Sequence, residues 1–132
     1  MTGFPLKIVT PDGLEFDGMA EQLIVRTVTG DVGIMAKHAD CVAPLGMGEA
    51  TVVIDGQRRY AACIGGMVSV INGSVNLVPT TFEWAENIDV ARAEASEKRA
   101  QAILANKSAT DTEIKLAKAR LRRALVRKNV RR

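Results

Sequence analysis

The chain has 132 residues, of which 47% are hydrophobic and 25% charged, a size and composition typical of one small soluble domain or a domain with an appendage. No apolar run reaches the roughly 20 residues of a membrane-spanning helix. The first residues, Met1 to Pro5, lack the basic and apolar regions of a signal peptide, so we expect a cytoplasmic protein. Two cysteines, Cys41 and Cys63, do not make a disulfide framework or a metal cluster, and we expect two buried, reduced thiols.

The charge is divided unevenly along the chain. Residues 1–85 hold five basic and nine acidic residues, whereas residues 86–132 hold thirteen basic and six acidic ones. No acidic residue follows Lys115. We therefore expect the partner of the C-terminal segment to be acidic.

Short apolar runs separated by turn residues predict strands in the first part of the chain. Pro11-Asp12-Gly13 has the residue types of a tight turn, and Leu14 follows it at the start of a second strand. We expect strands at 5–10, from 14 onward and at 21–27, a turn at 29–33, and a polar loop at 35–41.

Two hairpins are indicated by two-residue turn signals. Asp55-Gly56 separates the runs 49–54 and 57–63, and Asn72-Gly73 separates 67–71 and 74–78; both dipeptides favour the type I′ turn. Gly65-Gly66 indicates a bulge or a close backbone approach, and 79–86 is expected to be a connector. Many short strands with regular turns predict a sandwich or barrel.

The remainder of the chain predicts two helices. The first runs from Ile88 to about Ala105, with Asn87 or Asp89 as its N-cap. A loop at 106–109 precedes Thr110-Asp111-Thr112-Glu113, which is a capping box. On the second helix we expect one apolar face, made by Ile114, Ala117, Leu121, Ala124 and Leu125. A short loop makes the two helices antiparallel neighbours.

The first helix is expected to dock through alanines. Its predicted apolar face consists of Ala91, Ala95 and Ala102, which favour the helix but bury little area. Such a hairpin could adopt two positions that a partner or ligand biases. The alternative is permanent packing on the β domain.

Few residues could carry chemistry. His38 is the only histidine, and with Asp31, Asp40 and Cys41 it forms no known metal-ligand spacing, so a contact loop is the preferred interpretation. Arg92 and Arg99 share a helix face. Arg122, Arg123 and Arg127 follow on the second helix, and guanidinium groups from both helices suit phosphate. The alternative is a solvated basic face.

Together these motifs identify a family. The chain resembles the epsilon subunit of bacterial F-type ATP synthases. The similarity is carried, in order, by Ile8-Val9-Thr10-Pro11-Asp12-Gly13, Gly30-Asp31-Val32-Gly33-Ile34 with His38-Ala39, Gly65-Gly66-Met67-Val68-Ser69-Val70, Ile88-Asp89-Val90-Ala91-Arg92-Ala93 and Leu121-Arg122-Arg123-Ala124-Leu125.

The resemblance implies an α+β fold, with an N-terminal antiparallel β-sandwich of two five-stranded sheets at residues 1–86 and a C-terminal antiparallel two-helix hairpin at 87–132. It implies a non-catalytic rotor subunit of a proton- or sodium-translocating ATP synthase, peripheral to the cytoplasmic face of the bacterial membrane. The sandwich would join the gamma subunit to the c-ring. The hairpin would extend to the alpha and beta subunits and inhibit ATP hydrolysis. No resident cofactor is implied, although regulatory ATP, with or without magnesium, binds the hairpin in some relatives.

The resemblance also implies site residues. Asp31 matches a ring-contact position and His38 a position near gamma. The basic face that inhibits hydrolysis would comprise Arg122, Arg123 and Arg127. The nucleotide contacts of relatives fall on Glu83, Ile88, Asp89, Arg92, Ala93, Arg99 and Arg122. The chain departs from the family pattern at Ala36-Lys37 and Asp40, where Pro-Gly and proline are usual, and at Val126, where some ATP-binding members have arginine.

Two other classes of function fit the sequence less well. A nucleic-acid-binding protein would use the basic helices against phosphate, but the β domain is acidic and the basic segment lacks aromatic residues. A small β-sandwich enzyme would need a nucleophile paired with a base, and the sequence predicts no such pair.

Overall fold

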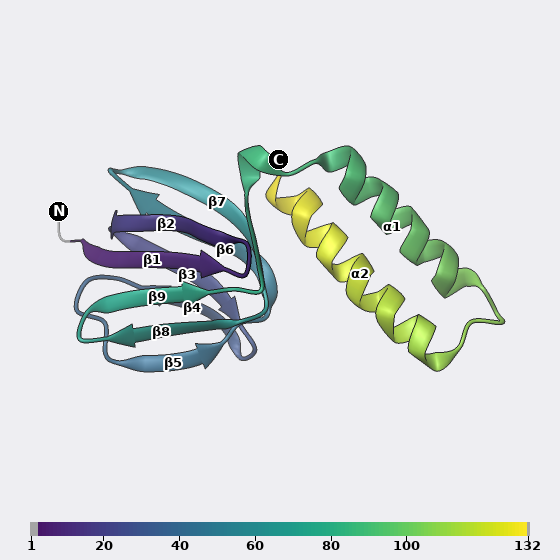
Figure 1. The fold of residues 1–132 in the computed structure, drawn as a ribbon, viewed down its shortest axis with the longest axis horizontal. Coiled ribbons are helices and arrows are strands. Elements are labelled where there is room, and N and C mark those ends of the chain that lie inside the picture. The colour runs from purple at the N-terminus through teal and green to yellow at the C-terminus, as the bar shows by residue number, and fades with distance from the viewer. Residues whose placement is uncertain (1–2, 132) are drawn as a thin grey trace. The chain divides into compact units, whose positions relative to one another are not determined.

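The structure is a computed structural model that describes residues 3–131. The chain divides into two compact units, one ending at Ala85 and the other beginning at Glu86. The first unit is a β-sandwich, and the second is a pair of α-helices (Figure 1).

The sandwich contains two five-stranded sheets. The first has the order β2-β1-β9-β8-β5 and the second the order β10-β7-β6-β3-β4. The strands are β1 (Phe4–Thr10), β2 (Gly13–Ala20), β3 (Gln22–Thr27), β4 (Gly30–Ile34), β5 (Cys41–Pro44), β6 (Met47–Ile54), β7 (Gln57–Ile64), β8 (Met67–Ile71), β9 (Ser74–Val78) and β10 (Thr81–Trp84). All pairings are antiparallel except that of β1 with β9, which is parallel. The predicted sandwich is confirmed.

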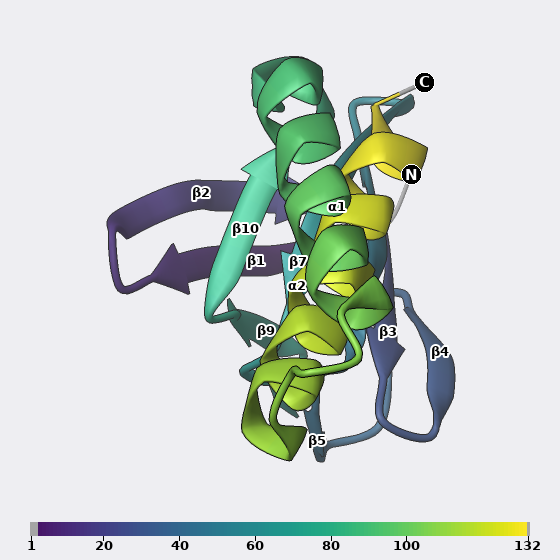
Figure 2. The same cartoon turned by 90° about the vertical axis from the view of Figure 1, so that its right-hand side faces the viewer.

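Alternating side chains from both sheets fill the core. In β1, Leu6 and Ile8 are buried while Lys7 between them is exposed, as period-two geometry requires. The same alternation recurs in β9, where Val75 and Leu77 point inward. Figure 2 shows the second sheet from another side, with β3 and β4 adjacent. The core is aliphatic, with Phe4, Phe82 and Trp84 as its buried aromatic residues.

Both two-residue hairpin turns are confirmed by their backbone angles. Asp55 and Gly56 have φ of 51° and 75°, and Asn72 and Gly73 have 50° and 80°. Positive φ at both central residues is the type I′ requirement. The turns fix the register of β6 against β7 and of β8 against β9.

Three strands were not predicted: β4, β5 and β10. The predicted turn at 29–33 is wrong beyond residue 29, because Thr27 already pairs with Gly30 in the β3–β4 register, so that the turn lies at 28–29 and 30–34 is strand. The predicted loop at 35–41 ends one residue early, at β5. The connector predicted at 79–86 contains β10, which pairs with β7 from Thr81 to Trp84, and the 3-10 helix η1 (Ala85–Asn87).

Both helices of the second unit are capped by hydrogen bonds at their ends. Helix α1 (Val90–Ala105) is capped by Asp89, whose Oδ1 accepts from the backbone N–H of Arg92 at 3.1 Å. Helix α2 (Asp111–Val130) begins with the predicted capping box between Thr110 and Glu113. In this capping box the backbone N–H of Thr110 donates to Oε1 of Glu113 at 3.1 Å, and this bond lowers the pKa of the Glu113 carboxyl.

The buried residues of the two helices are four alanines and Val130, but the alanines on α1 are not the predicted ones. Ala93 and Ala100 are buried there, seven residues apart, and Ala117 and Ala124 repeat this spacing on α2. Ala91, Ala95 and Ala102 are exposed. The predicted face of α2 is correct at its two alanines, whereas Leu125 is 38% exposed. Because α1 carries alanine on every side, its sequence does not indicate which face is buried, and the predicted face was wrong for this reason.

The double glycine produces the close approach predicted for it. A Cβ built on Gly66 (φ +89°) would lie 2.0 Å from the carbonyl oxygen of Val78. At Gly73 (φ +80°) a Cβ would meet nothing within 4 Å. Both glycines therefore have positive φ, but only Gly66 lacks room for a side chain.

We expect Gly66→Ala to lower the free energy of unfolding of the sandwich by about 2–4 kcal/mol, because it combines positive φ with a clash against backbone. Gly73→Ala is the matched control and should cost only about 1 kcal/mol. Urea denaturation followed by the fluorescence of Trp84, which is buried in the sandwich, measures both. Equal losses would contradict the role of close packing.

We expect Lys37→Gly to stabilise the sandwich by about 1 kcal/mol. Lys37 has a φ of 65°, a backbone conformation that is unfavourable for a residue with a Cβ atom and not for glycine. It is the third residue of a turn closed by a hydrogen bond from His38 N–H to the Met35 carbonyl at 3.2 Å, where glycine is favoured. Lys37→Ala removes the charge and keeps the Cβ. A gain from the alanine variant equal to that from glycine in the same urea experiment would exclude the backbone explanation.

Candidate functional site: an arginine-lined cleft between the two helices

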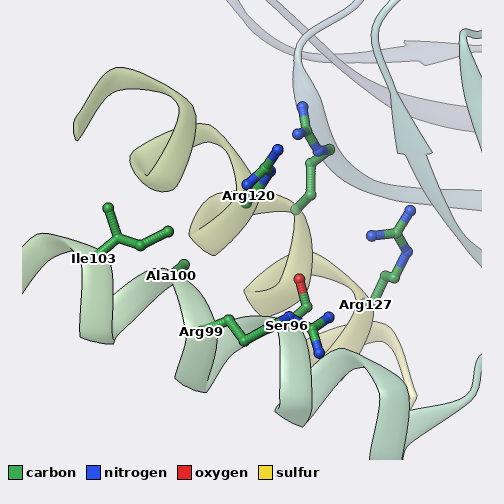
Figure 3. Close-up of a pocket in the computed structure, with 7 residues that line it drawn as sticks. Ser96, Arg99, Ala100, Ile103, Arg120 and Arg127 are labelled. Atoms are coloured by element: carbon green, nitrogen blue, oxygen red, sulfur yellow. The ribbon is translucent and has the colours of Figure 1, made fainter. Parts of the chain in front are cut away.

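A cleft of about 320 Å³ lies between α1 and α2. Figure 3 shows Ser96, Arg99, Ala100 and Ile103 on one helix facing Arg120 and Arg127 on the other. Arg123 completes the lining. Four of the seven lining residues are therefore arginines, and both helices contribute to the cation cluster.

Helical spacing brings the lining residues together. On α2, Arg120, Arg123 and Arg127 are separated by three and four residues, which places them on one face. Arg122 lies 100° around the helix from Arg123; it is exposed and does not line the cleft. On α1, Ser96, Arg99 and Ile103 follow the same spacing.

The charge of the cleft is of one sign. None of its lining residues is acidic. Glu97, next in sequence to Ser96, is held by Lys128 through an ion pair of 2.8 Å between Nζ and Oε1. This bond, with the nearby charges of Glu97 and Glu94, raises the pKa of the Lys128 ammonium. Within residues 3–131, Arg99, Arg120 and Arg123 have no ion-pair partner.

The chemistry available in the cleft is anion binding. A planar guanidinium group donates two parallel N–H bonds to a phosphate or carboxylate. Ser96 adds one hydroxyl, while Ala100 and Ile103 supply apolar wall. Among the described residues no cluster of three or more metal-ligating side chains occurs. Burial raises the pKa of the Cys63 thiol in the sandwich to about 12, so it is not a nucleophile at neutral pH; Cys41 is partly exposed, contrary to the expectation.

The nucleotide residues implied by the resemblance are only in part brought together. Arg99 lines the cleft, whereas Ile88, Asp89, Arg92 and Ala93 do not. Asp89 caps α1, and Arg92 is exposed at its start. Glu83 lies in β10 and belongs to the sandwich unit.

Sequence reasoning missed Arg120 and Ser96. The signal for Arg120 was present, since its spacing to Arg123 and Arg127 matches one helix face. The predicted basic face of Arg122, Arg123 and Arg127 is divided in the structure, with the first exposed and the other two in the cleft.

Asp31 is paired with a cation on the neighbouring strand. Arg26 and Asp31 are directly opposite in the β3–β4 register. Nε of Arg26 donates to Oδ1 of Asp31 at 2.7 Å, which raises the pKa of the guanidinium. Both side chains are about half exposed, at 51% and 56%. The Asp31 carboxylate is therefore held in place at the surface.

His38 lies in a second hollow, of about 530 Å³, on the sandwich. It is lined among others by Phe4, Lys37, Asp40 and Asn72. Nδ1 of His38 lies 2.8 Å from the carbonyl oxygen of Ala39. Oδ1 of Asp40 accepts from the backbone N–H of Asn72 at 2.9 Å, so that the departure from the usual proline ties this loop to the β8–β9 turn.

Apolar side chains cover part of the outer face of the first sheet. Val42, Met67, Ile71 and Val78 are 60%, 45%, 53% and 49% exposed. Val78 is opposite Met67 in the β8–β9 register, and Val42 is opposite Ser69, which lies between Met67 and Ile71 on β8. We call these four residues the apolar sheet face. Contiguous exposed apolar residues of this kind mark protein interfaces.

Neither helix of the described chain, residues 3–131, has the length and apolar character to cross a membrane.

Known proteins match this chain over nearly all its length. Residues 3–85 match the family of the ATP synthase delta/epsilon chain, beta-sandwich domain, and residues 86–130 match its long alpha-helix domain. The ATP synthase epsilon chain of Ruminococcus albus is 41% identical over 98% of this chain and 97% of its own, and that of Bacillus velezensis is 42% identical over 95% and 94%.

Solved structures share the fold. A chain in the Euglena gracilis mitochondrial ATP synthase structure (OSCP/F1/c-ring) aligns with a TM-score of 0.81 at 20% identity, over 92% of this chain and 77% of that one. A chain in the central stalk/c-ring structure of the Tetrahymena thermophila mitochondrial ATP synthase aligns with a TM-score of 0.63 at 15% identity, over 97% and 96%. With two domain matches in order and relatives above 40% identity, the chain belongs to the ATP synthase delta/epsilon chain family.

Proposed function

We propose that this chain is a non-catalytic central-stalk subunit of a proton- or sodium-translocating ATP synthase, whose sandwich joins the gamma subunit to the membrane ring and whose hairpin regulates ATP hydrolysis. Support comes from the family membership and from solved relatives within stalk and ring assemblies. Its place would be the cytoplasmic face of the membrane, as a peripheral subunit.

The observation that carries this proposal is the apolar sheet face. Val42, Met67, Ile71 and Val78 extend across three neighbouring strands, β5, β8 and β9. Exposing them to water is unfavourable, and a permanent partner would remove this cost. We assign this face to the gamma subunit.

The ring contact is proposed for Asp31 on β4, and a contact near gamma for the loop of His38. The Arg26–Asp31 pair fixes one carboxylate at the surface, and the Asp40–Asn72 bond anchors the loop of His38. Polar groups that are already fixed suit recognition, because little conformational entropy is lost when they bind.

The hairpin is proposed to move, and to reach the alpha and beta subunits when extended. Its buried residues are largely alanines, which provide little apolar area. Its ion pair, Glu97–Lys128, is partly exposed and so contributes modestly. Arg122, Arg123 and Arg127 would then meet an acidic surface and block hydrolysis. Binding of ATP to the hairpin stays a prediction, with contacts expected at Glu83, Ile88, Asp89, Arg92, Ala93, Arg99 and Arg122.

We expect removal of residues 88–132 to leave binding to gamma intact and to relieve inhibition of hydrolysis, since the docking face lies in the sandwich. Co-purification with gamma and ATPase assays of the reassembled complex measure the two effects. Met67→Asp in the full chain is the complementary variant: at a 45% exposed position it should fold but bind gamma at least about tenfold more weakly. Loss of gamma binding on truncation, or unchanged binding by Met67→Asp, would contradict the assignment.

We expect joint replacement of Arg122, Arg123 and Arg127 by alanine to weaken inhibition of ATP hydrolysis, because three cations that would meet acidic groups are lost. The difference from the unmodified chain should shrink as salt is added, since screening removes the same attraction. Lys118→Ala, at an exposed position on the same helix, shows the effect of losing one positive charge elsewhere on that helix. Unchanged inhibition at low salt would exclude the electrostatic explanation.

A further inference from the structure

We propose that Arg26 is a positioning residue for the ring contact, because it fixes the carboxylate of Asp31 as a hydrogen-bond acceptor. The group that Asp31 meets on the ring is then a neutral donor and not a lysine or arginine. This role rests on the proposed function, in which Asp31 contacts the membrane ring, and it determines which chemical group of the ring can be bound.

Strand pairing brings the two side chains together. Arg26 on β3 and Asp31 on β4 are opposite each other in the antiparallel register, and directly opposite residues have Cβ atoms roughly 4.5–5.5 Å apart. Nε of Arg26 donates to Oδ1 of Asp31 at 2.7 Å, and Nη2 lies 3.5 Å from Oδ2. The guanidinium group therefore meets the carboxylate side-on, with one short bond and one long one, and sets its orientation.

Two glycines at and just before the start of β6 make room for the stem of Arg26. A Cβ built on Gly48 would lie 2.7 Å from Cβ and 3.1 Å from Cγ of Arg26, and one built on Gly46 would lie 3.5 Å from Cγ. Neither glycine has a positive φ, so the backbone conformation does not demand glycine there. Gly46 also donates its backbone N–H to the carbonyl oxygen of Arg26 at 2.9 Å. The stem of Arg26 therefore lies close against β6, an approach that glycine in a strand permits.

The confined stem distinguishes Arg26 from an ordinary surface arginine. A surface ion pair gains little when two long side chains must be ordered to form it. Here β6 already limits the stem of Arg26, and Asp31 has a short side chain, so less conformational entropy is lost. The two side chains remain 51% and 56% exposed, so a partner can still reach the pair.

The pair carries no net charge, and this determines the chemistry of its partner. A lysine or arginine of the partner would be repelled by the guanidinium group of Arg26 and would have to compete with it for the carboxylate. A neutral donor, such as a peptide N–H, a hydroxyl or a carboxamide, can bond the remaining lone pairs of the Asp31 carboxylate without that repulsion.

Binding of the full chain, assembled with gamma, to the purified membrane ring tests this role. We expect Arg26→Ala to weaken ring binding about fivefold, because the charge-assisted hydrogen bond that orients Asp31 is lost. Arg26→Lys keeps the charge without the fork and should fall in between. Tighter binding by Arg26→Ala at low salt, where charges are least screened, would show that the ring presents a cation for which Arg26 competes, and would overturn the proposal.

A double-mutant cycle separates positioning from direct contact. Asp31→Ala should weaken ring binding more than Arg26→Ala does. In the Asp31→Ala background, Arg26→Ala should cause no further loss, because a residue that acts through Asp31 has no effect without it. Additive losses would show that Arg26 itself contacts the ring and would overturn the positioning role.

Arg58 provides the matched control for charge. It is exposed on β7, in the same sheet as Arg26, and Arg58→Ala should leave ring binding unchanged. A loss equal to that of Arg26→Ala would show a general effect of positive charge and overturn the role of Arg26. Circular dichroism should show the same strand content in every variant, since a half-exposed ion pair contributes little to stability.

The isolated full chain supplies a second readout. The Nε–H of Arg26 should give an NMR signal that is protected from exchange with water, and Asp31→Ala should remove this protection. An unprotected signal in the unmodified chain would show that the pair does not persist in solution and would overturn the proposal.

The single variants also distinguish this role from the proposed function. Unchanged ring binding by Asp31→Ala would remove Asp31 from the ring contact and overturn both. Weakened binding by Asp31→Ala together with unchanged binding by Arg26→Ala would leave the ring contact standing and overturn only the role of Arg26.

Discussion

The packing of two helices through alanine determines most of what this chain can do. Ala93, Ala100, Ala117 and Ala124 are the buried alanines of the hairpin, and small side chains let helix backbones approach closely. Close backbones bring the longer side chains that flank the alanines into one another's reach. The arginines of α2 and Arg99 of α1 meet in one cleft for this reason.

The same packing limits the strength of the hairpin. Alanine favours the helical conformation, so each helix is locally stable, helped by the caps at Asp89 and Thr110. Yet alanine buries far less apolar area than leucine, and the interhelical contact is correspondingly weak. The cluster of guanidinium groups opposes closure, while the Glu97–Lys128 pair favours it. Stable helices joined weakly are what a regulatory arm requires, because charged partners can then shift its position.

The sequence was informative where one residue type forces a conformation. Asp55-Gly56 and Asn72-Gly73 predicted both hairpin turns, Gly66 the close approach, and Thr110 with Glu113 the start of α2, because each involves positive φ or a specific hydrogen bond. Strands β4, β5 and β10 were missed because they have only four or five residues each, and because β5 and β10 pair with strands distant in sequence, β8 and β7. The turn predicted at 29–33 likewise included residues of β4, which pair with β3.

The site shows a different limit of sequence reasoning. Matching to a family motif drew attention to Arg92 and Arg122, since these occupy the family's positions. In the structure both are exposed, and Arg123 lies in the cleft with Arg120 and Arg127. A difference of one residue on a helix rotates a side chain by 100°, which is enough to exchange a site residue for a solvent-facing one. The helix face, rather than the aligned position, therefore decides which arginines can act together in this chain.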